Sequence, residues 1–325
     1  MFPFRYTKAA DEQAALRAGA AGARYIAGGT TLVDLMRERV ERPDSLVDIN
    51  GLPYSSIEVQ PGRIHIGSLV RMSELAAHPA VRQQVPMISQ ALELSASAQL
   101  RNMASIGGNL LQRPRCLYFR DVSAACNRRS PGAGCSATEG RNRAHAILGT
   151  SQHCSATHPS DLAVVLLALD AVVVTRDSAT QRRIPLAELH RQPGDSPHLE
   201  HNLRPGELIV AVEVPVGPEA RRSGYLKVRD RQSYQFGLAS AAVALDIGAG
   251  TIRGARVAVG GVATVPWRLP AVEAALLRRP PSADVFRSAA ALAADGAKPL
   301  RENGYKIELL KHTVERQLAV VAAMP

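Results

Sequence analysis

Four cysteines are the most specific chemical signal in this chain of 325 residues. Cys116, Cys126, Cys135 and Cys154 are its only cysteines, and all lie within residues 113–157. This segment is rich in Arg, Gly and Ser and has little hydrophobic periodicity, which makes it a poor candidate for a packed core. A structureless stretch of this length is expected to be functional or disordered. Four thiolates on an adaptable loop can surround a metal centre.

Three interpretations of the cysteines compete. Disulfides need an oxidising compartment, and the N-terminus has no secretory signal. Structural zinc normally uses close Cys-x-x-Cys pairs, whereas nine, eight and eighteen residues separate these cysteines. A [4Fe-4S] cluster accepts four thiolates from spread positions. The spacing alone favours zinc and an iron–sulfur cluster about equally. Four arginines lie near these cysteines in the sequence: Arg113, Arg115, Arg128 and Arg129. Their positive charges would stabilise the reduced form of a cluster and raise its reduction potential. Alternatively, the arginines are solvated or pair with carboxylates of a partner.

Two segments join paired glycines to hydroxyl side chains. In residues 25–32 a strand leads through Gly28-Gly29 to a helix that Thr30 and Thr31 can cap. Residues 105–109, Ser-Ile-Gly-Gly-Asn, suggest a second turn with the same chemistry. Glycine admits a ligand close to the backbone, and a helix start attracts anions, so a pyrophosphate suits both. Neither is a Rossmann GxGxxG motif. Each alone is more often a plain turn; the two together favour a ligand site.

The elements that would position these residues fall into three units. Residues 1–55 predict a small α/β unit, residues 56–218 a second unit interrupted at 113–157, and residues 219–325 an antiparallel meander followed by helices. Expected helices span 9–17, 31–39, 72–77, 87–94, 160–168, 271–277, 283–294 and 305–323. Expected strands span 24–27, 45–49, 57–60, 63–66, 171–175, 183–185, 208–214, 224–229, 239–247 and 251–259.

Composition excludes several function classes. Aromatic residues make up only 4% of the chain, which argues against a nucleic-acid reader built on base stacking. The net charge of +10 is spread along the sequence and indicates an Arg-rich surface or a face for an acidic partner or anionic cofactor. No apolar run approaches the roughly 20 residues of a membrane span. We therefore expect a cytoplasmic chain; export to the periplasm on a partner's signal stays open.

The order of three motifs resembles a known family. Residues 27–30 (Ala-Gly-Gly-Thr), 105–109 and 157–162 (Thr-His-Pro-Ser-Asp-Leu) occur in this order in FAD-binding subunits of the xanthine dehydrogenase and carbon monoxide dehydrogenase group. Residues 227–231 and 234–240 are similar to the C-terminal domain of that group. The cysteine segment resembles the subset with a [4Fe-4S] insertion, most closely the FAD subunit of bacterial molybdenum aldehyde oxidoreductases. The hydroxybenzoyl-CoA reductase type shares such an insertion.

The resemblance implies an α+β fold. It consists of a two-part FAD domain of the vanillyl-alcohol-oxidase-like (PCMH) type, 1–55 and 56–218 with an iron–sulfur insertion at 113–157, then a carbon monoxide dehydrogenase flavoprotein-type domain, 219–325. It implies that the cysteines ligate the cluster, that Asp161 binds a cofactor hydroxyl, and that His145 and His158 are structural. Implied FAD contacts are Arg24, Tyr25, Ile26, Ala27, Gly28, Gly29, Thr30, Thr31, Leu32, Ser105, Gly108, Asn109, Asp161, Ile209 and Lys227.

The implied function is electron transfer without substrate chemistry in this chain. FAD would accept electrons from the [2Fe-2S] clusters of a small partner subunit and pass them to an external acceptor, while a large partner subunit holds molybdopterin. The extra cluster would serve structure and docking at least as much as relay. Alternatives are a hydroxybenzoyl-CoA reductase-type or xanthine dehydrogenase-type subunit, a stand-alone FAD oxidoreductase, and a non-enzymatic metal-binding scaffold. The sequence indicates neither the substrate nor the terminal acceptor.

Overall fold

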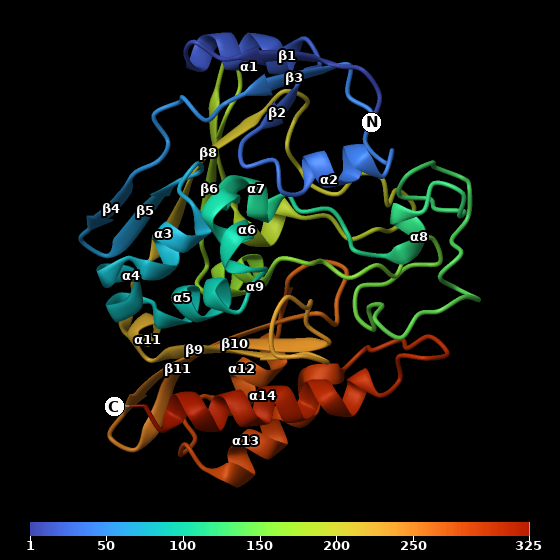
Figure 1. Cartoon of the computed structure of the whole chain (residues 1–325). Helices are drawn as coiled ribbons and strands as arrows, with labels where there is room; N and C mark the ends of the chain where they lie inside the picture. Colours follow the sequence, from blue (N-terminus) through green and yellow to red (C-terminus); the bar gives the residue numbers. More distant parts are fainter. Residues whose placement is uncertain (325) are drawn as a thin grey trace.

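The structure, a computed structural model, describes residues 1–324. Its first unit, at the top of Figure 1, is a three-stranded parallel sheet in the order β1-β3-β2. The side chain of Asp11 accepts the N–H of Ala14 at 2.7 Å, and this cap starts the first helix later than the predicted residue 9. The elements are β1 (Arg5–Lys8), α1 (Glu12–Ala20), β2 (Arg24–Ile26), α2 (Leu32–Arg37) and β3 (Ser45–Asp48).

The second unit is a five-stranded antiparallel sheet in the order β4-β5-β8-β6-β7, with helices packed beside it. The central strand β8 is the last of the five in sequence. The chain therefore forms both sides of the sheet, β4-β5 and β6-β7, before β8 is inserted between them. The elements are β4 (Ile57–Gln60), β5 (Arg63–Gly67), α3 (Met72–Ala77), α4 (Pro79–Gln84), α5 (Pro86–Glu93), α6 (Ala98–Met103), α7 (Ile106–Leu110), α9 (Asp161–Ala168), β6 (Val172–Arg176), β7 (Gln181–Pro185), α10 (Leu186–Leu189) and β8 (Leu208–Pro215).

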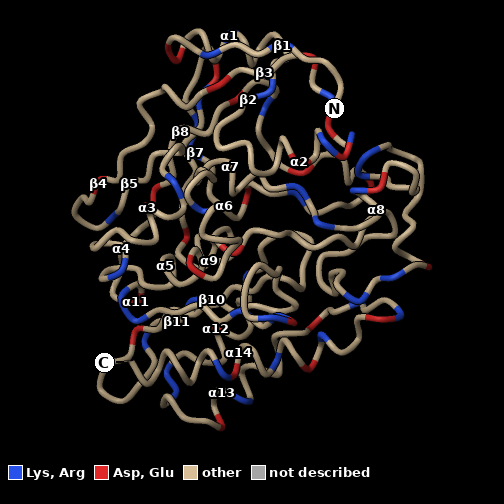
Figure 2. The backbone as a smooth tube through the Cα atoms, in the orientation of Figure 1, with Lys and Arg blue, Asp and Glu red and all other residues tan. Residues whose placement is uncertain are grey.

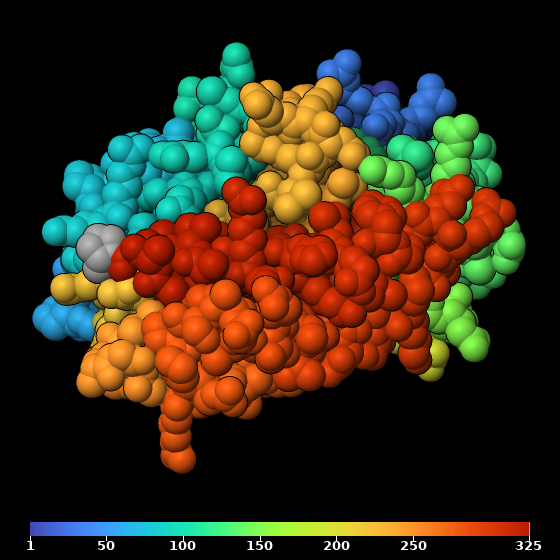
Figure 3. Space-filling model, turned by 90° about the horizontal axis from the view of Figure 1, so that it is seen from below, coloured from blue at the N-terminus to red at the C-terminus, as the bar shows by residue number. Residues whose placement is uncertain are grey.

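The third unit is the predicted antiparallel meander, in the order β12-β11-β10-β9. Helix α14 lies across its outer face, as the view from below in Figure 3 shows. The predicted apolar stripe of α14 packs on β9 and β10, with Leu310, Val314 and Leu318 fully buried. The elements are α11 (Pro218–Arg221), β9 (Ser223–Val228), β10 (Ala239–Gly248), β11 (Thr251–Gly260), β12 (Trp267–Arg268), α12 (Pro270–Leu276), α13 (Ala283–Ala290), η1 (Ala291–Ala294) and α14 (Lys306–Ala322).

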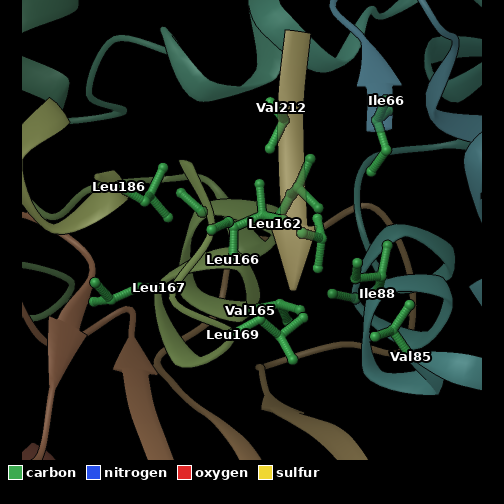
Figure 4. Packing of buried hydrophobic residues seen from close by; sticks show 14 of the residues in the cluster. Ile66, Val85, Ile88, Leu162, Val165, Leu166, Leu167, Leu169, Leu186 and Val212 are labelled. Atoms are coloured by element: carbon green, nitrogen blue, oxygen red, sulfur yellow. The ribbon is translucent and has the colours of Figure 1, made fainter. Parts of the chain in front are cut away.

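Helix α9 joins the second and third units. Residues 162–168 are all buried and nearly all apolar, as expected of a helix covered on every side. Figure 4 shows Leu162 and Leu166 in the cluster that also contains Val212 of β8, while Ile88 of α5 packs nearby. On another side, α9 contacts β10 and β11 of the meander. The third unit therefore covers apolar surface that the second unit would otherwise expose.

Residues 113–157 form the excursion drawn in green at the right of Figure 1. Its one helix is the single turn α8 (Leu117–Arg120), in line with the weak periodicity of the segment. The excursion docks on the third unit through polar contacts. Asn303 donates to the carbonyl oxygens of His145 and Ala146 at 3.2 Å, and the fully buried Lys306 donates to those of Ala144 and Gly261 at 3.0 and 2.6 Å.

The predicted α+β fold is confirmed, and most predicted elements lie within a few residues of their observed bounds. Each predicted unit contains one of the sheets, while the unit boundaries themselves stay predictions. One expectation is wrong. Residues 106–110 form the helix α7, so Gly107 and Gly108 lie in a helical turn without positive φ and not in a glycine turn. Sequence periodicity also missed β1 and the short helices α4, α6, α10 and α11, which span too few residues for a repeat to emerge.

Lys306 gives the fold a testable pH dependence. Burial, with a contribution from the charge of Arg143, lowers the pKa of Lys306 from 10.5 to about 7. Between pH 7 and 10.5 the unfolded chain therefore holds more protons at this residue, so its contribution makes stability rise with pH. We expect Lys306→Met to remove up to about 1.4 kcal/mol per pH unit from that slope. Urea unfolding of both proteins at pH 7.0, 7.75 and 8.5 measures it; equal slopes would contradict the assignment.

Candidate functional site

A cavity of about 480 Å³, the large cavity below, lies where all three units meet. Its size is typical of ligand pockets. Every residue named in the sequence as an FAD contact lines this cavity: Arg24, Tyr25, Ile26, Ala27, Gly28, Gly29, Thr30, Thr31, Leu32, Ser105, Gly108, Asn109, Asp161, Ile209 and Lys227. The segments are far apart in sequence and the fold brings them to one wall. Their contacts with a cofactor stay predictions.

The first glycine pair sits in the turn between β2 and α2. Gly29 has φ +69°, which favours glycine, and a Cβ at Gly28 would lie 1.9 Å from the carbonyl oxygen of Met103. Only a residue without a side chain lets this turn approach the end of α6. The expected hydroxyl cap is absent, because Thr31 stands at the N-cap position but its side chain makes no capping bond. Thr30 and Thr31 both border the large cavity.

The second glycine pair lies in the first turn of α7. Ser105 caps this helix by accepting the N–H of Gly108 at 3.3 Å. The side chain of Asn109 is buried, and its oxygen accepts the Ser160 hydroxyl at 2.5 Å. Because Ser160 is the N-cap of α9 and accepts the N–H of Ala163, Asn109 helps to fix the start of that helix. Asn109 thus organises the cavity wall as well as bordering the cavity.

Asp161 and Lys227 form a buried ion pair in this wall. Lys227 Nζ lies 2.8 Å from Asp161 Oδ2, which also accepts the Ser95 hydroxyl at 2.8 Å, and Asp161 Oδ1 accepts the Tyr225 hydroxyl at 2.6 Å. The Lys227 side chain is only 1% exposed. Burial and then the charge of Asp161 raise the pKa of Tyr225 well above its usual range, so the phenol remains a donor. Oδ1 has a lone pair to spare for a cofactor hydroxyl.

The four cysteines, called the cysteine site below, line a second and much smaller cavity. All are free thiols, and Cys126 pairs its backbone with Cys135 in an isolated bridge. Arg128 donates to Cys154 Sγ at 3.6 Å, and His145 Nε2 lies 3.2 Å from Cys116 Sγ. Among residues 1–324, no three His, Cys, Asp or Glu side chains converge closely enough to hold a single metal ion. Burial raises the pKa of Cys116 to about 12, so this thiol stays neutral unless a strong positive charge binds beside it.

The arginines near the cysteine site pair with carboxylates of this same chain. Arg115 lies 3.1 Å from Asp34 of α2, and Arg120 pairs with both Asp34 and Glu38. Figure 2 shows the resulting mixture of basic and acidic segments between α2 and α8. These pairs tie the excursion to the helix that follows the first glycine pair. The expectation that the arginines are solvated or pair with carboxylates of a partner is therefore wrong for Arg115, and it is wrong for Arg113 and Arg128 as well, which pair with carboxylates of this chain.

Sequence reasoning missed other residues of the large cavity. Glu41 and Arg113 border it and form an ion pair with each other. A loop between β9 and β10 contributes further residues to the cavity wall, among them Phe236. The Arg115 guanidinium lies over the Phe236 ring, 5.1 Å from the ring centre. No local pattern marks such residues, since their partners lie far away in sequence. His158 lies outside this cavity, partly buried against His190 with ring centres 4.3 Å apart.

Known proteins share both the sequence and the fold. Residues 2–217 match the family "FAD binding domain in molybdopterin dehydrogenase", and residues 224–320 match "CO dehydrogenase flavoprotein C-terminal domain". The aldehyde oxidoreductase FAD-binding subunit PaoB of Escherichia coli is 47% identical over 93% of this chain and 92% of its own. A 6-hydroxypseudooxynicotine dehydrogenase complex subunit of Paenarthrobacter nicotinovorans is 31% identical over 97% and 93%.

Solved structures agree on the fold. Reconstituted carbon monoxide dehydrogenase of Oligotropha carboxidovorans superposes with a TM-score of 0.78 at 20% identity, covering 100% of both chains. Quinoline 2-oxidoreductase of Pseudomonas putida gives 0.76 at 23% identity, covering 99% and 98%. The two family matches, together with this fold, define a flavoprotein of the carbon monoxide dehydrogenase type. The chain belongs to the FAD-binding subunits of the molybdenum hydroxylase family and is an oxidoreductase subunit of its aldehyde oxidoreductase group. No described helix is both long and apolar enough to cross a bilayer.

Gly28 allows a direct test of the large cavity. Alanine at this position would push its Cβ against the Met103 carbonyl oxygen, and backbone cannot yield as a flexible side chain does. Overpacking of this kind costs about 1–3 kcal/mol. We expect Gly28→Ala to weaken FAD binding about tenfold or more, measured by fluorescence titration of the flavin-free protein. Gly304→Ala, where nothing lies within 4 Å of the added Cβ, is the control and should keep its affinity. Equal affinities of the two variants would refute the role of Gly28.

Lys227 tests the buried pair. Lys227→Met leaves the Asp161 carboxylate without its cation, and breaking such a pair costs about 3–5 kcal/mol. The double variant Asp161→Asn/Lys227→Met removes both charges and should regain part of that loss. Chemical denaturation of the wild type, Lys227→Met, Asp161→Asn and the double variant gives the coupling. Additive losses in the double variant would show that the two groups do not stabilise each other.

Proposed function

We propose that this chain is the FAD and [4Fe-4S] electron-transfer subunit of a heterotrimeric, molybdenum-dependent aldehyde oxidoreductase. One observation carries the proposal: every predicted FAD contact borders the large cavity, and the four cysteines border a second cavity in the adjoining excursion. Membership in the FAD-binding family supports FAD as the cofactor of the large cavity. The 47% identity to an aldehyde oxidoreductase subunit supports the aldehyde as substrate class of the complex.

The large cavity suits FAD in size and in the chemistry of its wall. Gly28 and Gly29 bring backbone close to the ligand, Thr30 and Thr31 offer hydroxyls, and Asp161 offers an acceptor to a ribityl or ribose hydroxyl. When bound, FAD supplies a junction between one-electron and two-electron transfer. The chain's own part is to bind and orient the flavin and to surround it with fixed charges.

The support for a [4Fe-4S] cluster comes from the family resemblance and from the grouping of the four cysteines. The described residues hold no three side chains already placed to bind a metal ion, so this site would have to adjust around either a cluster or zinc. In a cubane each thiolate binds a different iron, so the sulfurs stand farther apart around one volume. All four cysteines border one cavity, and Arg128 aims an N–H at Cys154. That donor and its charge would stabilise the reduced cluster and raise its potential.

The large cavity favours electron transfer over an independent oxidase. No histidine borders it among residues 1–324, and Asp161 is held by Lys227 and two hydroxyls. The other carboxylates of the wall are paired as well, Glu41 with Arg113 and Glu207 with Arg182, so the described wall offers no free general base. Relatives whose names read "complex subunit" and "medium chain" support partner subunits. We propose a molybdopterin-binding large subunit and a [2Fe-2S] small subunit as the partners, and a cytoplasmic chain unless a partner's signal directs export.

Absorption spectroscopy and iron analysis test the cluster. Anaerobically purified wild-type protein should show flavin bands with a broad iron–sulfur shoulder and about four irons per chain. Cys126→Ser should lose the shoulder and most of the iron while keeping the flavin bands. Ser123→Ala, in the same excursion and exposed, is the control and should match wild type.

Turnover of the complex then assigns the role of the cluster. If Cys126→Ser complexes turn over like wild type, the cluster is not on the obligatory electron route and serves structure or docking. Flavin bands without iron in wild-type protein after anaerobic reconstitution would refute the cluster and leave the family assignment intact.

A further inference from the structure

An unbroken line of charges connects the large cavity to the cysteine site. Arg113 borders the large cavity, and its guanidinium binds Glu200 through Nε at 2.8 Å and Nη2 at 2.6 Å. The other oxygen of Glu200 lies 3.3 Å from Nη1 of Arg128. Arg128 in turn donates to Cys154 Sγ. One carboxylate therefore holds two arginines, each of which touches a different site.

The line is well shielded from water, so its charges interact strongly. The side chains of Arg128, Glu200 and Arg113 are 5%, 16% and 23% exposed. Water screens these ionic contacts only weakly, so their geometry is well fixed. If one side chain of the line moves, its charged neighbour therefore has to move with it. The backbone also connects the two sites directly, because only two residues separate Arg113, at the large cavity, from Cys116 of the cysteine site.

We propose that Glu200 is a positioning residue that couples the two sites, so that a filled cysteine site strengthens binding of FAD in the large cavity. The inference rests on the cluster proposed above. It assigns Glu200 neither substrate contact nor proton transfer. Its action is to keep the Arg113 guanidinium against the wall of the large cavity when Arg128 is engaged at the cysteine site.

The direction of the coupling follows from how Glu200 is shared. When no cluster is bound, Arg128 has Glu200 as its near anion, with Nη1 3.3 Å from the carboxylate oxygen Oε2. The carboxylate is then divided between two cations. Bound thiolates give Arg128 an anionic partner of its own, so Glu200 can hold Arg113 in one place. A wall ordered before the flavin arrives binds it more tightly, and the coupling is reciprocal by thermodynamic linkage.

FAD affinity of the full-length chain measures this coupling. Flavin-free protein is prepared in two forms, with the cluster and with its iron removed by a chelator, and both are titrated with FAD. In wild type we expect the cluster-loaded form to bind FAD about fivefold or more tightly. In Glu200→Gln the ratio should fall below about twofold, because a neutral amide holds the two guanidiniums less firmly.

Two further variants secure the comparison. Glu188→Gln makes the same change on an exposed residue of α10 that pairs with no basic side chain among residues 1–324, and it should keep the wild-type ratio. The double variant Glu200→Gln/Arg128→Gln removes one charge of each sign, which protects folding, and should also lose the ratio. Circular dichroism verifies the fold of each.

The outcomes separate this inference from the one it rests on. Equal FAD affinity of the two wild-type forms overturns the coupling while the cluster stands. A wild-type ratio retained by both Glu200 variants leaves coupling but removes Glu200 from it, which also overturns the inference. Wild-type protein that takes up no iron overturns the cluster and the coupling together.

Discussion

The buried ion pair of Asp161 and Lys227 is the constraint on which the arrangement of the molecule depends. Helix α9 is apolar on all sides and has to be covered on all sides, yet it begins with a carboxylate. That carboxylate is stabilised inside the protein by Lys227, which β9 of the third unit brings to 2.8 Å, and by the hydroxyls of Ser95 and Tyr225. Asp161 and Lys227 both line the large cavity, so the contact that positions the third unit also completes the wall of the site.

The excursion of residues 113–157 is held by a different kind of force. It contributes few residues to the apolar cores and forms one helical turn. Its position comes from Ile147 and Leu148, which are buried in the core of the third unit, from buried polar contacts such as those of Asn303 and Lys306, and from ion pairs with α2. Polar contacts of this kind are specific but add little net stability. A segment so built benefits greatly from a metal centre, whose binding energy becomes folding energy.

The sequence predicts the repeating parts of this fold well. Helix α14 and the strands of the meander have long apolar repeats, and they lie where those repeats put them. The members of the large cavity followed from a family resemblance, since spacing alone could not bring Gly28, Asp161 and Lys227 together. Glu41 and Glu200 escaped prediction because each meets its arginine only after folding, across 72 and 87 residues. The second glycine pair misled because its helix is too short to show a period.

Fixed charge explains why a chain without an evident acid–base pair can still control redox chemistry. An electron arriving at either proposed cofactor adds negative charge, and a nearby guanidinium stabilises the reduced form. Arg113 borders one site and Arg128 the other, each partly balanced by Glu200. The carboxylate thus limits how strongly either site retains an electron. Arg113 also pairs with Glu41, so two anions balance these two cations, and of the two only Glu200 is shared between the sites.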